Sequence, residues 1–153
     1  MRTQTRLFLL FIALILTLSA CTAAKKAGTA EDIYAAMEKA GLLSPMIPMT
    51  GDELYDLTGI HPDLWDDGSL HQAADGLIAD EILILHARDE AGANEIEKYL
   101  RARLESKAEE AKGYSPEQYA VIQKGVILRG GQDLCLIVSP QAEKLRAVYG
   151  EYR

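Results

Sequence analysis

Apolar residues cluster at the start of the chain and then recur in short periodic runs. The stretch Leu7–Leu18 is almost wholly apolar, follows Arg2 and Arg6, and leads into Ser19-Ala20-Cys21. A basic start, an apolar segment and small residues before a cleavage point are typical of a secretory signal peptide. The apolar stretch has 12 residues, whereas a membrane-spanning helix needs roughly 20. Residues 1–20 are therefore predicted to be a cleaved signal peptide, with an uncleaved anchor as the alternative.

The residues at the predicted cleavage point carry a second signal. Leu18-Ser19-Ala20-Cys21 resembles the lipobox of bacterial lipoproteins, whose cysteine is lipidated on sulfur before cleavage in front of it. The mature chain is then expected to begin at a lipid-bearing Cys21 on the extracytoplasmic face of the cell membrane. Residues 21–28 would form a lipidated tether, and residues 29–153 are expected to form one domain.

Apolar residues at spacings of three and four predict helices at several places in this domain. The longest such stripe runs from Ala93 to Ala111, and Glu53 completes a capping box with the threonine three positions before it. Polar residues that can cap a helix precede each predicted segment. These predicted caps are Thr29, Thr50, Asp89, Ser115 and Ser139.

Short apolar runs predict strands near residues 69–74, 82–87, 125–129 and 133–138. The second run is apolar on both faces, which favours a central place in a sheet. Gly130-Gly131 separates the last two runs and predicts a hairpin with a two-residue turn. The order of elements indicates an α+β domain, in which helices pack on one face of an antiparallel sheet.

Charge and cysteine content narrow the range of partners. The signal peptide holds two of the 16 basic residues and no acid, so the mature chain has 14 Lys and Arg against 23 Asp and Glu, a formal charge of −9. Nucleic acid is therefore not expected as a partner, and the lipid on Cys21 must hold the domain to the membrane. With Cys21 lipidated, Cys135 has no disulfide partner. Cys135 lies in an apolar run with no His or Lys beside it, which favours a core residue over a reactive thiol.

Histidines and aspartates between residues 61 and 71 form the best candidate for metal chemistry, because imidazole and carboxylate together can bind zinc. They are His61, Asp63, Asp66, Asp67 and His71. Their spacing matches no recognised ligand pattern, and Asp66-Asp67-Gly68-Ser69 also has the composition of a turn. We therefore expect no bound metal and no cofactor, and we keep a hydrolase using Asp63, Asp66, Asp67 and His71 as the alternative.

Other polar residues give no catalytic pattern. No serine lies in a nucleophile elbow or a Ser-x-x-Lys motif. Asp80-Glu81 could serve acid–base chemistry, but its place before an apolar run favours a solvated strand start. Tyr114 and Tyr119 bracket the Ser-Pro helix and are expected to anchor it to the sheet, with a binding patch as the alternative.

Several segments resemble one family. Tyr55-Asp56-Leu57-Thr58-Gly59-Ile60-His61-Pro62 is similar to the opening signature of a bacterial lipoprotein family, domain of unknown function 4358. Ala79–Ile82 with Ala87–Asp89 is similar to the central strand and long helix of this family. Tyr114–Tyr119 is similar to its C-terminal block. The resemblance covers roughly residues 30–150. It implies one α+β domain behind a lipobox and brings no activity with it.

These observations lead to one functional expectation. The chain is expected to be a membrane-anchored extracytoplasmic lipoprotein that acts as a non-catalytic binding or interaction module. Its expected partners are the membrane, through the lipid on Cys21, and a protein or ligand of the cell envelope. An exposed apolar or tyrosine-rich patch would favour this hypothesis. A deep cleft that gathers Asp63, Asp66, Asp67 and His71 would favour a small envelope enzyme instead.

Overall fold

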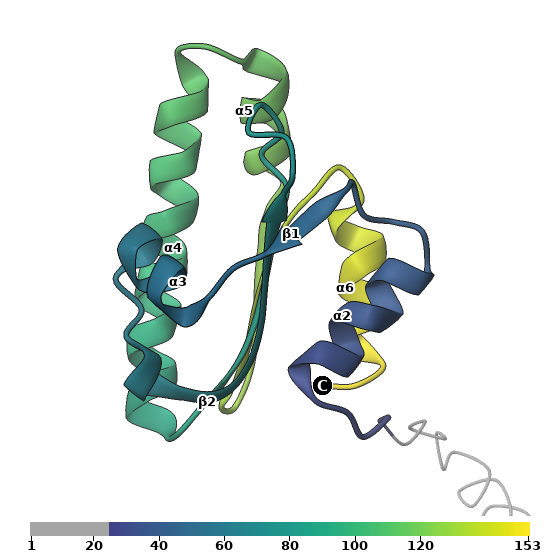
Figure 1. Ribbon diagram of the computed structural model, residues 1–153, viewed down its shortest axis with the longest axis vertical. Helices are drawn as coiled ribbons and strands as arrows, with labels where there is room; N and C mark the ends of the chain where they lie inside the picture. Colours follow the sequence, from purple (N-terminus) through teal and green to yellow (C-terminus); the bar gives the residue numbers. More distant parts are fainter. Residues whose placement is uncertain (1–24) are drawn as a thin grey trace, which may run out of the picture.

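The computed structural model describes residues 25–153, which form one α+β domain around a five-stranded antiparallel sheet (Figure 1). The strand order is β1-β2-β3-β5-β4. The strands are β1 (Met46–Pro48), β2 (Trp65–Ala73), β3 (Glu81–Ala87), β4 (Val126–Gly130) and β5 (Asp133–Val138). The helices are α2 (Ala30–Lys39), α3 (Gly51–Thr58), the short 3-10 helix η1 (Pro62–Leu64), α4 (Glu90–Lys112), α5 (Pro116–Ile122) and α6 (Ala142–Gly150). The predicted fold class and antiparallel sheet are confirmed.

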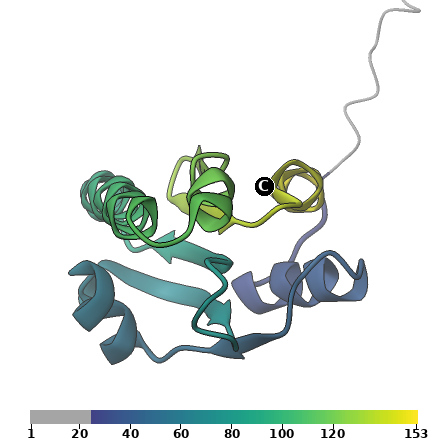
Figure 2. The same cartoon turned by 90° about the horizontal axis from the view of Figure 1, so that it is seen from above.

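Helices cover both faces of this sheet, so the prediction that they pack on one face is wrong. Along β3, Ile82 and Ile84 pack with α2 and α6, whereas Leu83 and Leu85 pack with α3, α4 and α5. Seen from above, α3 and α4 lie on one side of the sheet and α2 and α6 on the other (Figure 2). The physical reason lies in the strands themselves, because alternate residues point to opposite faces and both sets are apolar here.

The first half of the sheet differs most from the sequence-based expectation. The strand predicted near residues 69–74 begins earlier, at Trp65, so that Asp66–Ser69 lies in β2 and is not a turn. The pairing with β3 shifts between Trp65 and Asp67, an irregularity of the kind that a β-bulge produces. Residues 46–48 add β1 as an unpredicted edge strand, and its Pro48 is compatible with an edge position.

The hairpin between β4 and β5 is confirmed, but its turn lies one residue later than predicted. Gly130 pairs with Asp133, which leaves Gly131 and Gln132 as the two turn residues. Gly131 has a φ of 65°, and it is the turn residue with positive φ. A turn with glycine at the first central position and positive φ there alone has the pattern of type II′.

Side-chain caps fix the starts of most helices. Thr29 and Thr50 form capping boxes with Asp32 and Glu53, and Asp89 accepts a hydrogen bond from the backbone N–H of Gly92 at 2.7 Å. Ser115 likewise caps α5. The predicted cap at Ser139 is wrong, because α6 begins at Ala142 without a side-chain cap and the Ser139 hydroxyl accepts from the Gln141 N–H instead.

The segment before α2 lies against the C-terminal end of the domain. The Lys26 N–H donates to the Glu151 carbonyl at 2.7 Å, and the Arg153 guanidinium donates to the Gly28 carbonyl at 2.9 Å. Residues 26–28 are therefore part of the domain, although residues 21–28 were expected to be tether. The predicted signal peptide and Cys21 lie outside the described residues. No helix in residues 25–153 is both long enough and apolar enough to cross a bilayer.

Candidate functional site

The histidines and aspartates of residues 61–71 do not form one site. Asp63 and Asp66 are exposed, and the Asp67 carboxylate accepts a hydrogen bond from the Ala30 N–H at 2.8 Å, at the start of α2. His61 caps η1, where its Nδ1 accepts from the Asp63 N–H at 3.2 Å. Within residues 25–153, no group of three or more His, Cys, Asp or Glu side chains could hold a metal ion.

His71 has a structural environment on the α2 face of the sheet. Its ring stacks on the Tyr34 ring with centroids 3.5 Å apart, and its Nδ1 lies 3.3 Å from the Ser69 hydroxyl. The Ser69 hydroxyl donates to the Glu31 carboxylate at 2.7 Å. Burial lowers the pKa of His71, although the carboxylates of Glu31 and Glu38 oppose this shift. These contacts join α2 to β2.

Cys135 is fully buried on β5, among Ile82, Ile84 and residues of α2 and α6. Burial raises the pKa of its thiol far above the ordinary value, so the nucleophilic thiolate is strongly disfavoured. The structure therefore confirms the interpretation of Cys135 as a core residue.

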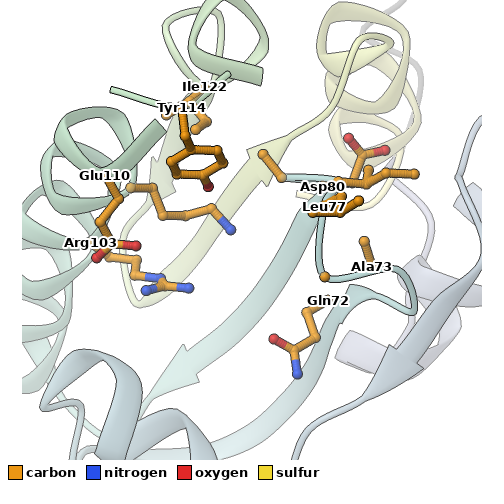
Figure 3. Close-up of a pocket in the computed structure, with 12 residues that line it drawn as sticks. Gln72, Ala73, Leu77, Asp80, Arg103, Glu110, Tyr114 and Ile122 are labelled. Atoms are coloured by element: carbon orange, nitrogen blue, oxygen red, sulfur yellow. The ribbon is translucent and has the colours of Figure 1, made fainter. Parts of the chain in front are cut away.

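A pocket of about 180 Å³ lies between α4 and the connection from β2 to β3 (Figure 3). Residues 76–80 of that connection form one wall, and Arg103, Lys107 and Glu110 of α4 form the other. Tyr114, in the turn after α4, and Ile122 of α5 close one end. The lining combines charged and apolar groups, which is the combination that small-molecule sites use for orientation and contact area.

Glu81 holds the cationic wall of this pocket in place. Its side chain is 1 % exposed, and it accepts hydrogen bonds from Arg103 Nε at 3.2 Å, Arg103 Nη2 at 2.9 Å and Lys107 Nζ at 2.6 Å. Burial opposes ionisation of Glu81, but Lys107 and Arg103 outweigh it and lower the pKa of the carboxyl. The prediction of a solvated strand start at Asp80-Glu81 is therefore wrong.

Two cations face one carboxylate in this buried cluster. The side chains of Arg103 and Lys107 are each 12 % exposed, and both line the pocket while they bind Glu81. Neither ion uses all of its donors on Glu81, because guanidinium carries five N–H groups and ammonium three. Both cations therefore keep donors that Glu81 does not use, beside the carboxylates of Asp80 and Glu110 in the lining.

Asp80 belongs to the opposite wall, and its carboxylate lies apart from Arg103 in Figure 3. Burial raises the pKa of Asp80, and the nearby Ser44 side chain and the charge of Lys107 limit the rise. The backbone next to it is fixed to α5, because the Ala79 N–H donates to the Gln118 side-chain oxygen at 2.8 Å. This bond positions the loop wall against the helices.

Two large apolar residues stand at the mouth of the pocket. Leu77 is 75 % exposed and Tyr114 is 66 % exposed, and both line the pocket. Tyr119 packs against the core as predicted, but the expected anchoring role of Tyr114 is not seen. The exposed position of Tyr114 instead fits the alternative, a binding patch.

The apolar stripe of α4 does not indicate this cationic wall, and two other signals in the sequence bear on it. Arg103 and Lys107 are four residues apart on the helix, which places them on one face. Glu81 opens a strand whose next four residues are apolar, and an acid in that position needs a partner when the strand is central. The two signals together could have predicted the cluster.

Comparison with known families decides the membership of this chain. The model of one family, Domain of unknown function (DUF4358), matches residues 39–139. The chain belongs to the DUF4358 family. The match confirms the resemblance to the domain of unknown function 4358. No curated protein matches the chain, and no solved structure matches it either.

The DUF4358 match contains the whole pocket, since every lining residue lies between Gln72 and Ile122. It contains the five strands and the helices of the α4 face. Most of α2 and all of α6 lie outside the matched range, although both cover the second face of the sheet. The pocket is therefore a feature of the DUF4358 part of the chain.

Proposed function

We propose that this DUF4358 protein is a lipid-anchored extracytoplasmic binding module. The anchoring part rests on Leu18-Ser19-Ala20-Cys21, which has the composition of a lipobox behind an apolar segment. The binding part rests on the pocket beside α4. The pocket places the cations of Arg103 and Lys107 beside apolar surface, which is the combination that supports binding of a small molecule.

The arrangement of Arg103 and Lys107 carries the proposed choice of ligand. Glu81 holds both cations in fixed positions, while Asp80 and Glu110 add carboxylates elsewhere in the lining. A carboxylate or phosphate that enters the pocket would find donors that are already oriented, so it would lose little freedom in the protein. We propose a small organic anion as the ligand.

The size of the pocket limits this ligand. A volume of about 180 Å³ lies below the roughly 300–1,000 Å³ of typical small-molecule sites. Leu77 and Tyr114 at the mouth offer apolar surface to the rest of the molecule. A monocarboxylate with a short apolar body fits these properties.

The position of the pocket suits a module tethered at its N-terminus. In Figure 1, α5 and the end of α4 lie at one end of the long axis, and the first described residues lie at the other. A lipid on Cys21 would hold that second end near the bilayer. The pocket would then face away from the membrane, toward the solutes of the envelope.

Binding can be tested with the domain spanning residues 25–153 and three small carboxylates. Propionate, isobutyrate and N-acetylalanine are titrated by calorimetry, each beside its neutral amide. We expect a carboxylate to bind and its amide not to bind. Lys107→Met should abolish binding, whereas Lys112→Met, an exposed residue of the same helix, should leave it unchanged. Equal behaviour of carboxylates and amides would contradict the proposal, as would the absence of any binding.

Anchoring needs a separate experiment on the full chain in a bacterial host. Metabolic labelling with a clickable fatty acid should label the wild-type protein and the Cys135→Ala variant equally. The Cys21→Ala variant should remain unlabelled and uncleaved, because only this cysteine can form the lipid thioether. Equal label in the Cys21→Ala variant and the wild type would refute the proposed anchor.

A further inference from the structure

A second pocket, of about 250 Å³, lies where the described chain begins. Lys25 lines it together with Leu128 of β4 and Arg146, Tyr149 and Arg153 at the C-terminal end of the chain. The adjoining residues 26–28 are bonded to Glu151 and Arg153, so the start of the chain has a fixed place beside the pocket. We call it the tether-end pocket.

Basic side chains dominate the tether-end pocket, but they differ in how far they are neutralised. Arg129 also lines it, yet its guanidinium forms ion pairs with Glu90 and Glu97 on α4. Arg153 donates to Asp133 at 2.8 Å. These two cations already have carboxylate partners.

Lys25 and Arg146 keep their donors available. Arg146 is 56 % exposed, and its ion-pair contact is a 3.8 Å approach to Glu143, which is too long for a hydrogen bond. Among residues 25–153, no carboxylate lies within ion-pair distance of Lys25. The pocket thus presents one cation without a carboxylate at ion-pair distance, Lys25, and a second, Arg146, whose ion pair with Glu143 leaves its N–H donors available.

Tyr149 forms part of the pocket wall. The residue is 5 % exposed, and its hydroxyl oxygen is buried, so the hydroxyl is not a donor for a ligand in the pocket. Lys25 and Arg146 are the donors that remain, and both suit an oxygen-rich anion.

The short distance along the chain from the pocket to Cys21 indicates which anion would lie near the pocket. Lys25 is four residues beyond Cys21, and four extended residues span at most about 14 Å. A lipid on Cys21 would therefore keep this pocket within reach of the headgroup layer. The rest of the mature chain is acidic, so anionic lipids would repel the body of the domain and attract this end.

We propose that the tether-end pocket binds the phosphate of an anionic phospholipid headgroup, with Lys25 and Arg146 as its donors. This proposal rests on the lipid anchor proposed above, since the anchor brings the pocket to the bilayer. Headgroup binding would orient the domain with α6 toward the membrane and the pocket beside α4 away from it.

The test uses the chain from residue 21 with Cys21→Ala, so that its outcome does not depend on lipidation. Dihexanoyl-phosphatidylglycerol, kept below the concentration at which it forms micelles, is titrated and followed by amide NMR. We expect saturable shifts at Arg146, Tyr149 and Gly150, and none of comparable size with dihexanoyl-phosphatidylcholine. Arg146→Gln should weaken binding about fivefold, the effect of one basic residue near an anionic lipid surface.

Matched controls decide between this proposal and its alternatives. Lys112→Gln removes a similarly exposed cation from the C-terminal end of α4 and should change the affinity less than twofold, as expected from a distant surface site. Inorganic phosphate that binds as tightly as the lipid would show a simple phosphate site and overturn the proposal. Shifts elsewhere, equal shifts with phosphatidylcholine, or no shifts would overturn it too. Equal fatty-acid label in the wild type and the Cys21→Ala variant would instead refute the anchor, whatever this titration shows.

Discussion

Replacing Glu81 by Gln should destabilise the domain severely. The substitution keeps the size and shape of the side chain but removes the charge that two cations share. Arg103 and Lys107 are each only 12 % exposed, so water can replace the lost carboxylate only in part. Loss of one partner in a buried ion pair costs 3–5 kcal/mol, because it leaves a buried charge without compensation.

We expect a cost of about 3 kcal/mol for Glu81→Gln, at the lower end of that range, because the amide oxygen can still accept one hydrogen bond. For a domain of this size, such a loss lowers the melting temperature by about 10 °C. Glu110→Gln provides the control. Glu110 is exposed and accepts from the Ser106 hydroxyl at 3.1 Å, and a surface change of this kind stays within about 0.5 kcal/mol.

The pH dependence separates a charge effect from a packing effect. The pKa of Glu81 is lowered in the folded state from its ordinary value of 4.5. The stability that this carboxylate contributes is therefore complete above pH 4.5 and is lost as the pH falls through the lowered folded-state pKa. Urea unfolding of the wild type and of Glu81→Gln at several pH values should show that the difference in their free energies of unfolding becomes smaller in acid. A difference below 1 kcal/mol at neutral pH, or one that does not shrink in acid, would refute the reasoning.

Three further predictions concern single residues. Cys135 should resist thiol reagents until denaturant is added, because it is fully buried, and Cys135→Ala should cost about 1 kcal/mol; rapid labelling of the folded protein would contradict this. Burial lowers the pKa of His71 from 6.5, so the stability of the wild type should fall as the pH drops from 7 to 5, and that of His71→Phe should fall less, as measured by urea unfolding. Gly59 ends α3 with a φ of 81°, and an added Cβ would lie 3.1 Å from Tyr99. Gly59→Ala should therefore cost about 1–2 kcal/mol in thermal melts, whereas Gly113→Ala, with a φ of −86° and open space around it, should not destabilise the domain.

Local signals in the sequence predict most of the elements, because caps, apolar periods and turn residues act over a few positions. The run Asp133–Val138 is predicted to the residue, and Thr50 with Glu53 forms the predicted capping box. The alternation of Ile82 and Leu83 between two cores was also present in the sequence. A strand that is apolar on both faces is central in its sheet, and it also needs helices to cover each of those faces.

Contacts between distant residues account for what the sequence could not predict. Asp66-Asp67-Gly68 has the composition of a turn, but the Asp67 carboxylate finds the Ala30 N–H, 37 positions earlier, and the segment becomes part of β2. The partners of Glu81 lie 22 and 26 positions away on α4. No local pattern predicts which face of a helix will contact which strand, so the cationic wall is visible only in the folded structure.

The contact between Lys26 and Glu151 joins residues 125 positions apart in the chain. A ribosome makes the first of these residues long before the last, so the beginning of the domain must wait for its end. Until α6 is complete, the second face of the sheet has no full cover, and residues 26–28 have no surface on which to rest. A contact between residues so far apart also forms slowly, because the chain between them must lose conformational entropy before the contact can stabilise it. During synthesis, residues 26–28 therefore have no partners in the domain until Glu151 and Arg153 have been made.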